Sequence, residues 1–191
     1  MAGALVLVAC GDDHGTSTPS DPDFLDPTCQ GDPITPVCAA PTITEKANVS
    51  ANHIPDGTPI VYDDVPPSSG DHRPAWGRWG EYSMLPPQRW LHNLEHGGIV
   101  FLYDPCAPAA TIDALREYAR ARPDDASGQF RWVLTPYPGL PTTIAVIAWE
   151  WTWLGECVDS DAFDAFIDAH YRHGPEDISS DGSFQTNWLG R

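Results

Sequence analysis

The stretch LHNLEHGGIVFLY, residues 91–103, decides the fold of this chain and holds its most chemically capable side chains. A polar segment with two histidines and a glutamate ends at a glycine pair, and the run Ile99–Tyr103 that follows is strongly apolar. A short apolar run bounded by glycines is typical of a strand buried in a sheet. If the polar segment is helical, His92 and His96 lie on one face, four residues apart, with Glu95 beside them.

The spacing of these three side chains is His-x-x-Glu-His, the order of the inverted zinc-peptidase motif. Imidazole and carboxylate groups are ligands of zinc and copper ions. However, Gly97 and Gly98 end any helix one residue after His96, whereas those peptidases embed the motif in a long helix. The pattern therefore predicts a polar site that suits a metal ion, and it does not specify a reaction.

The second half of the chain has a regular pattern of further elements. Apolar residues at helical spacing predict a helix over Thr111–Arg122, and two apolar runs predict strands over Phe130–Thr135 and Thr143–Trp149. Ser160 can act as the N-cap of a second helix that stops at Gly174. The order β-α-β-β-α predicts an α+β fold, a small sheet with helices on one face. The Pro- and Trp-rich first half is expected to consist of loops held by aromatic side chains.

Charge and length narrow the class of partner. The 191 residues suffice for one domain with a core, the formal net charge is −17, and Lys46 is the only lysine. Because phosphate binding needs a basic surface, the composition argues against nucleic acid as a partner and against direct binding to an anionic membrane surface.

The N-terminal sequence indicates export. The stretch LVAC, residues 7–10, resembles a bacterial lipobox, which predicts a signal peptide at 1–9 and a lipid on Cys10. We therefore expect an extracytoplasmic protein that is anchored to the cell envelope through this lipid only. Residues 10–40 are acidic and rich in proline, which is typical of a flexible tether, and 41–191 are expected to form one domain. No Lys or Arg precedes the apolar run, so an ordinary cysteine after a short apolar segment remains the alternative.

The other four cysteines support export. An even number of cysteines in an exported chain predicts two disulfides, and four cysteines allow three pairings. We expect Cys29–Cys38, because the two are close in sequence, and Cys106–Cys157, because each follows a predicted strand. A zinc site of four thiolates is disfavoured, because the chain contains no Cys-x-x-Cys pair.

Three motifs together are similar to a known family. PPSSGDH at 66–72, WGEY at 79–82 and HNLEHG at 92–97 resemble the bacterial family called domain of unknown function 3105, over roughly residues 45–178. Members of that family are often exported or membrane-tethered, and the family implies no established activity. The resemblance links His72 to the pair His92 and His96, which the spacing of the residues alone does not do.

The candidate metal ligands are three histidines and one carboxylate: His72, His92, His96 and Glu95. This set suits zinc, copper or iron. Met84 is a possible further ligand whose thioether would favour copper(I), and its alternative role is to fill the core. Asp71 is expected either to orient His72 as a hydrogen-bond acceptor or to serve as a turn residue.

The remaining histidines are weaker candidates. His53 lies in an irregular segment from which it could approach the site. His170 and His173 end the last predicted helix, where we expect them to cap carbonyl groups. His14 lies in the tether and is not expected to take part.

The function favoured by these features is binding of a transition metal ion, in particular copper, without turnover. One alternative is a zinc-dependent hydrolase in which Glu95 is the base. Another is a structural or partner-binding envelope protein in which the histidines and Glu95 form only a buried hydrogen-bond network.

Overall fold

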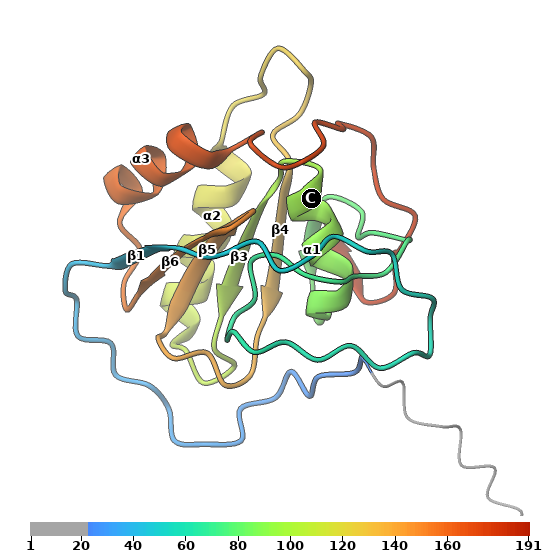
Figure 1. Cartoon of the computed structure of the whole chain (residues 1–191). Helices are drawn as coiled ribbons and strands as arrows, with labels where there is room; N and C mark the ends of the chain where they lie inside the picture. Colours follow the sequence, from blue (N-terminus) through green and yellow to red (C-terminus); the bar gives the residue numbers. More distant parts are fainter. Residues whose placement is uncertain (1–22) are drawn as a thin grey trace, which may run out of the picture.

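The computed structural model of the protein describes residues 23–191, which form a mixed seven-stranded sheet and three helices (Figure 1). The expected signal peptide, Cys10 and His14 lie outside the described residues. The strands are β1 (Thr42–Glu45), β2 (Gly80–Tyr82), β3 (Ile99–Tyr103), β4 (Trp132–Pro136), β5 (Ile144–Ala148), β6 (Trp151–Gly155) and β7 (Trp188–Gly190). The helices are α1 (Pro87–Glu95), α2 (Ala109–Ala121) and α3 (Ser160–His170). The expected α+β class is confirmed.

The strand order across the sheet is β1-β6-β5-β3-β4-β2-β7. Strands β3, β4 and β2 are parallel neighbours, whereas β5, β6 and β1 continue the sheet on one side by antiparallel pairing and β7 pairs antiparallel with β2 on the other. The apolar run Ile99–Tyr103 is therefore a central strand, as its composition predicts, with β4 and β5 on its two sides.

The sheet is covered on both faces. Val100 and Leu102 of β3 belong to an apolar cluster with α1, whereas Ile99 and Phe101 belong to a second cluster with α2 and α3. The two helices predicted from the second half thus share one face, as expected, and α1 lies on the other. From β2 to β3 the chain moves two places along the sheet, and from β3 to β4 it returns by one. Right-handed crossovers in opposite directions put their helices on opposite faces.

Several details of the second half differ from prediction, including the unpredicted strand β7 and the end of α3 at His170. Helix α3 is capped by Asp159, whose side chain accepts a hydrogen bond from the Ala162 backbone amide at 3.0 Å, and not by Ser160. Strand β6 was not predicted. It follows β5 through a tight turn in which Glu150 has a φ of 65°, a position without the glycine or asparagine that usually marks such a turn.

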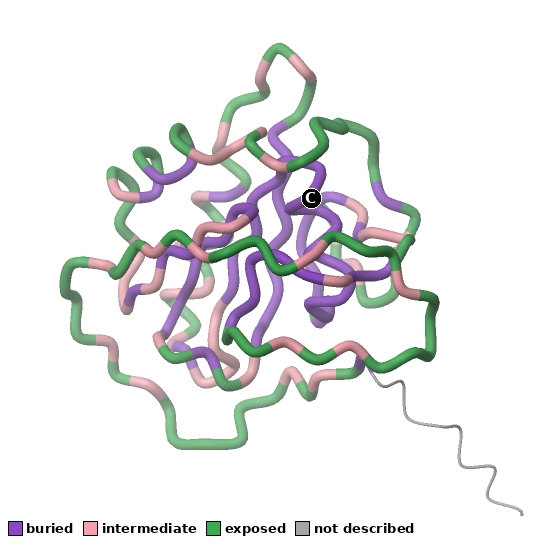
Figure 2. Tube along the Cα trace, in the orientation of Figure 1, coloured by how far each residue is buried: buried purple, intermediate pink, exposed green. Residues whose placement is uncertain are grey.

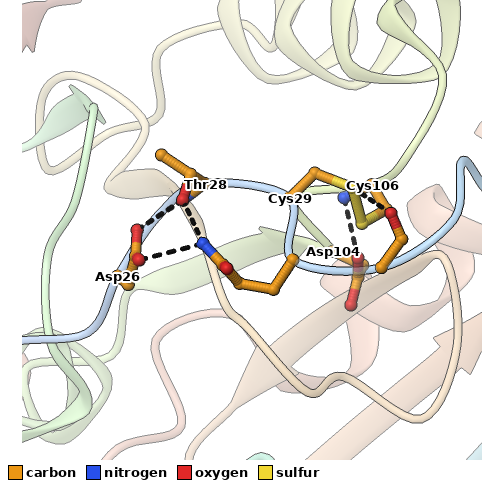
Figure 3. Close-up of a disulfide and its surroundings, with 7 residues drawn as sticks. Asp26, Thr28, Cys29, Asp104 and Cys106 are labelled. Atoms are coloured by element: carbon orange, nitrogen blue, oxygen red, sulfur yellow. Dashed lines mark hydrogen bonds between the residues drawn. A yellow bond between two sulfur atoms is a disulfide. The ribbon is translucent and has the colours of Figure 1, made fainter.

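The predicted disulfide pairing is wrong. The disulfides are Cys29–Cys106 and Cys38–Cys157, with Cα atoms 4.7 and 5.4 Å apart. Strand β1 pairs antiparallel with β6, so that Cys38, shortly before β1, reaches Cys157, shortly after β6. Figure 3 shows Cys29 joined to Cys106 in the segment after β3, beside Asp104.

Residues 23–40, the described part of the expected tether, are held to the domain at these two disulfides and at a third point. The carboxylate of Asp23 accepts hydrogen bonds from the guanidinium group of Arg73 at 2.5 and 2.6 Å. The Arg73 side chain is fully buried, and such charge-assisted pairs are among the stronger polar contacts in a protein. Among the described helices, none has the length and apolarity needed to cross a bilayer.

Candidate metal centre

Helix α1 and its C-cap residue, His96, supply three side chains of the site. The helix begins at Pro87, where a proline at the first position is favourable because its missing N–H would have no partner there. Leu91 and Leu94 pack in the apolar cluster of that face. All nine residues of α1 are buried, and Figure 2 shows this helix as a continuous buried segment. The sheet covers the apolar side of α1, and its polar side must therefore be covered by loops and the C-terminal segment.

The glycine pair ends α1 as the sequence predicts. Gly97 has a φ of +78° and its N–H donates to the Leu94 carbonyl at 2.8 Å, while the Gly98 N–H donates to the Asn93 carbonyl at 3.0 Å. A residue in the left-handed region that satisfies the last helical carbonyls is the usual helix C-terminus. His96 consequently lies at the very end of α1, next to the start of β3.

Backbone carbonyls fix the orientation of two imidazoles. The Nδ1 atom of His72 lies 2.8 Å from the carbonyl oxygen of Gly70, and that of His92 lies 2.8 Å from the carbonyl oxygen of Arg73. Since a carbonyl oxygen only accepts, both Nδ1 atoms must carry the proton. In the neutral ring the Nε2 atom then has a free lone pair, the form in which histidine binds a metal.

These Nε2 atoms face one carboxylate oxygen. Glu95 Oε2 lies 3.0 Å from Nε2 of His72, 3.8 Å from Nε2 of His92 and 3.5 Å from Nε2 of His53. The four potential ligand atoms of this group, which we call the first group, lie within 4.8 Å of one another. His72, His92 and Glu95 are buried, whereas the His53 side chain is 48% exposed.

His53 enters the site through backbone pairing. Its segment forms an isolated parallel bridge with that of His72, in which the His72 N–H donates to the Asn52 carbonyl at 3.0 Å and the Ile54 N–H donates to the His72 carbonyl at 2.8 Å. The His53 ring stacks on that of His92, with centroids 4.5 Å apart. From the sequence His53 is only a weak candidate, because its segment has no periodic pattern that would indicate this pairing.

Asp71 does not orient His72. Its carboxylate accepts a hydrogen bond from the Asn52 side chain at 2.9 Å, and the acceptor for His72 is the Gly70 carbonyl. Hydrogen bonds from Ser50 and Asn52 are causes of the lowered pKa of Asp71. Asp71 therefore holds the segment that carries His53 in place. The expected hydrogen bond from His72 to Asp71 is not formed.

Met84 lies in the loop between β2 and α1, before the first residue of the helix, whereas Glu95 and His96 lie at the opposite end of α1. Its side chain is buried, and its carbonyl accepts a hydrogen bond from Asn187. This location agrees with a packing role for Met84. Among the described residues, no contact of Met84 supports its predicted role as a thioether ligand of a metal.

His96 lies beside the first group and belongs to a second group with Glu95 and Glu176. Its Nε2 atom is 3.1 Å from Nε2 of His92 and 3.2 Å from Oε2 of Glu176. The ring is buried, and the indole of Trp76 packs against it and against His92, with centroids 4.5 and 4.8 Å apart. Glu176 was not predicted as a site residue, since it lies 80 residues after His96 in a segment without a metal-binding motif.

Burial controls the charge of the site. Desolvation lowers the pKa of His92 and of His96 to about 4, so both rings are neutral at pH 7. For Glu95, burial alone would raise the pKa, but hydrogen bonds and charges from His72, His92 and His53 outweigh it and lower the pKa below its usual value. A neutral ring at His92 and a lowered pKa at Glu95 agree with metal binding, which requires deprotonated ligand atoms.

The geometry leaves a gap in the hydrogen bonding. When His72 and His92 are neutral, their Nε2 lone pairs face the lone pairs of Glu95, so a proton or a metal ion must lie between these atoms for the contacts to be attractive. In a tetrahedral zinc site with bonds of about 2.0–2.1 Å, two ligand atoms are about 3.3–3.4 Å apart. The separations from Glu95 Oε2 to the three Nε2 atoms, 3.0 to 3.8 Å, bracket this value.

The last two histidines lie elsewhere. His173 Nδ1 donates to the Ala169 carbonyl at 2.8 Å, which confirms its predicted capping role. His170 instead stacks on the indole of Trp151, with centroids 4.2 Å apart.

The fold and the site together define an α+β protein with a buried cluster of histidines and a carboxylate that could hold a metal ion. The chain belongs to the family described as protein of unknown function (DUF3105), whose family model matches residues 53–182, more than half of the chain. The matched range begins at His53 and includes Glu176, so it contains every residue of both groups. No curated protein and no solved structure matches the chain.

Proposed function

We propose that this protein binds a transition metal ion, copper(II) or zinc(II), through the first group of His53, His72, His92 and Glu95, and that it does so without turnover. The observation that carries the proposal is the convergence of three Nε2 atoms on one buried carboxylate oxygen, at 3.0 to 3.8 Å. Two of these atoms belong to rings whose Nδ1 proton is committed to a backbone carbonyl. A cation at their centre would satisfy all four ligand atoms at once.

The donor set selects the class of metal. Three imidazole nitrogens and one carboxylate oxygen suit zinc(II) and copper(II), while a soft thioether would be needed to favour copper(I). Met84 lies before the opposite end of α1 and gives no such donor to this group. By the general order of divalent metal affinities, copper(II) should bind this nitrogen-rich site more tightly than zinc(II).

The position of Glu95 favours binding over hydrolysis. A catalytic base acts on a metal-bound water and stands away from the metal, and a catalytic zinc keeps one coordination position open. Glu95 Oε2 instead lies at hydrogen-bond distance from His72 and within 4 Å of the two other imidazoles, where a fourth ligand would be. The hydrolase is therefore the second candidate.

An extracytoplasmic, lipid-anchored location is part of the proposal. Two disulfides agree with an oxidising compartment, where such bonds persist. The lipobox-like residues 7–10 and the acidic segment after them supply the anchor and the spacer. A metal-binding domain held at the envelope surface would take up or retain metal ions outside the cytoplasm.

Calorimetric titration of the metal-free full chain with copper(II) and zinc(II) tests the proposal. The wild type should bind at least one ion per chain, and His72→Ala and His92→Ala should each reduce the affinity at least a hundredfold. His173→Ala removes an exposed histidine outside the cluster and should leave the affinity unchanged. A folded wild type that binds neither metal would mean that the cluster is a hydrogen-bond network, and the proposal would fail.

Glu95→Gln separates the binder from the hydrolase. The substitution retains the shape of the side chain and removes its charge. If Glu95 is a ligand, metal affinity falls with the charge. If Glu95 is a base, the metal stays bound at nearly wild-type affinity, and that outcome would favour the zinc hydrolase.

A further inference from the structure

We propose that the site holds two metal ions that share Glu95, the second ion being bound by Glu95, His96 and Glu176. This inference rests on the proposed function, because the second position borders the first. The second group is assembled from the end of α1 and from the segment that follows α3.

The location of His96 is the reason to propose a second metal position. Two atoms bound to one ion at about 2.0–2.1 Å lie at most about 4.2 Å apart. The ligand atoms of the first group all lie within 4.8 Å of one another, and His96 does not meet this limit for every member of the group. Its Nε2 atom nevertheless lies 3.1 Å from that of His92. A single ion held by the first group therefore leaves His96 unused, with its nitrogen directed at the edge of the site.

Binding of the first ion to His92 changes the hydrogen bonding of His96. The Nδ1 proton of His92 is donated to the Arg73 carbonyl, so its Nε2 atom can only accept. In the metal-free protein, Nε2–H of His96 can donate to it. Once the first ion takes the lone pair of His92, this acceptor is lost, and His96 is left with Glu176 and Glu95 as its neighbours.

The backbone holds Glu176 in place. Its N–H donates to the Glu95 carbonyl at 2.9 Å, and the Arg172 N–H donates to the Gly97 carbonyl at 2.8 Å. Gly174 lies so close to α1 that a Cβ atom there would be 2.3 Å from the Glu95 carbonyl oxygen. The segment 172–176 is thus packed against the end of α1, and this packing brings the Glu176 carboxylate to 3.2 Å from His96.

A buried arginine reinforces the same contact. Arg131 donates to the His96 carbonyl at 2.8 Å, and its guanidinium group lies 2.7 Å from the carboxylate of Asp177, the residue after Glu176. The Arg131 side chain therefore contacts both segments that supply the second group, the end of α1 and the segment that carries Glu176. The Glu176 carboxylate itself is not paired with this arginine and stays directed at His96.

The composition of the second group predicts how it differs from the first. It contains two carboxylates and one imidazole, and the Glu176 side chain is 51% exposed. Three protein ligands leave coordination positions for water, so the second ion should exchange faster and bind more weakly than the first. Carboxylate-bridged pairs of this kind usually hold their metals about 3.5–4 Å apart, a distance at which two copper(II) ions couple magnetically.

The test combines metal analysis with electron paramagnetic resonance (EPR) on the full chain loaded with excess copper(II) and then desalted. The wild type should retain two ions per chain, and its EPR intensity should account for less copper than metal analysis finds. Glu176→Gln should retain one ion, and its EPR intensity should match its copper content. Glu117→Gln, which changes an exposed glutamate of α2 on the opposite face of the sheet, should retain two.

The outcomes distinguish the two proposals. One ion in the wild type and one in Glu176→Gln would overturn the second position and leave the first intact. Two ions in both proteins would also overturn it, because the second ion would not depend on Glu176. Two ions with full EPR intensity would overturn the shared carboxylate. Retention of no copper by the wild type would instead contradict the metal-binding function on which the inference rests.

Discussion

Lowering the pH from 7 to 5 should destabilise the metal-free protein, because His92 and His96 are buried as neutral rings. Desolvation lowers the pKa of each to about 4, whereas an unfolded histidine titrates near pH 6.5. Between these two values the unfolded chain binds more protons than the folded protein. The stability is therefore complete above about pH 6.5 and is lost progressively as the pH falls towards 4.

The two pKa values set the size of the effect. At pH 5, protonation of the unfolded chain costs about 2 kcal/mol of folding free energy for one such imidazole and roughly 4 kcal/mol for both. This is a large share of the stability of a typical domain, which is about 5–15 kcal/mol. The interval stops at pH 5 because below it carboxylates with ordinary pKa values begin to titrate as well.

Urea denaturation at several pH values, followed by tryptophan fluorescence with a chelator present, measures this loss. His92→Asn retains a side-chain donor near the Arg73 carbonyl and removes one titrating group, so it should lose about 2 kcal/mol less than the wild type between pH 7 and 5. His173→Asn changes an exposed ring and should behave as the wild type does. Equal pH dependence in the wild type and His92→Asn would refute the assignment of a buried neutral ring.

Three further outcomes are expected. Gly174→Ala should lower the free energy of unfolding by about 1–3 kcal/mol, because its Cβ atom would collide with carbonyl oxygens of Leu94 and Glu95, whereas Gly31→Ala, with its closest contact at 3.9 Å, should change it by less than about 0.5 kcal/mol. Peptide mapping without reduction should recover Cys29 linked to Cys106 and Cys38 linked to Cys157, and any other pairing would contradict the chain path before β1. Metabolic labelling with a fatty-acid analogue should mark the wild type and not Cys10→Ser, and equal labelling would rule out the lipobox.

The regular elements could be predicted because each has a local signal. The apolar run of β3 and the helical spacing in α2 report burial on one or both faces, whatever the rest of the chain does. Strand β6 lacked a boundary signal, since Glu150 takes the left-handed turn position that glycine or asparagine would have marked.

The disulfide pairing, the place of His53 in the site and the role of Glu176 could not be predicted, because they depend on pairings between distant segments. Cys38 meets Cys157 only through the pairing of β1 with β6. His53 approaches through a bridge with the segment of His72, and Glu176 through the packing of its segment on the end of α1. Neither contact has a spacing in the sequence that would indicate it.

The position of Asp71 illustrates a local error. Neighbouring side chains of an extended backbone point to opposite sides, so a carboxylate directly before His72 is poorly placed to contact that ring. Asp71 instead contacts Asn52 in the paired segment. In contrast, His92 and Glu95 followed from helical spacing, and the family resemblance supplied His72.

X-ray absorption of the zinc-loaded protein is the most direct test of the metal site. We expect a first coordination shell of nitrogen and oxygen atoms at about 2.0–2.1 Å, with the outer-shell scattering of several imidazole rings that His72→Ala and His92→Ala each reduce. A shell with sulfur at about 2.3 Å, or one of oxygen alone without imidazole scattering, would contradict the histidine ligands that the structure brings together around Glu95.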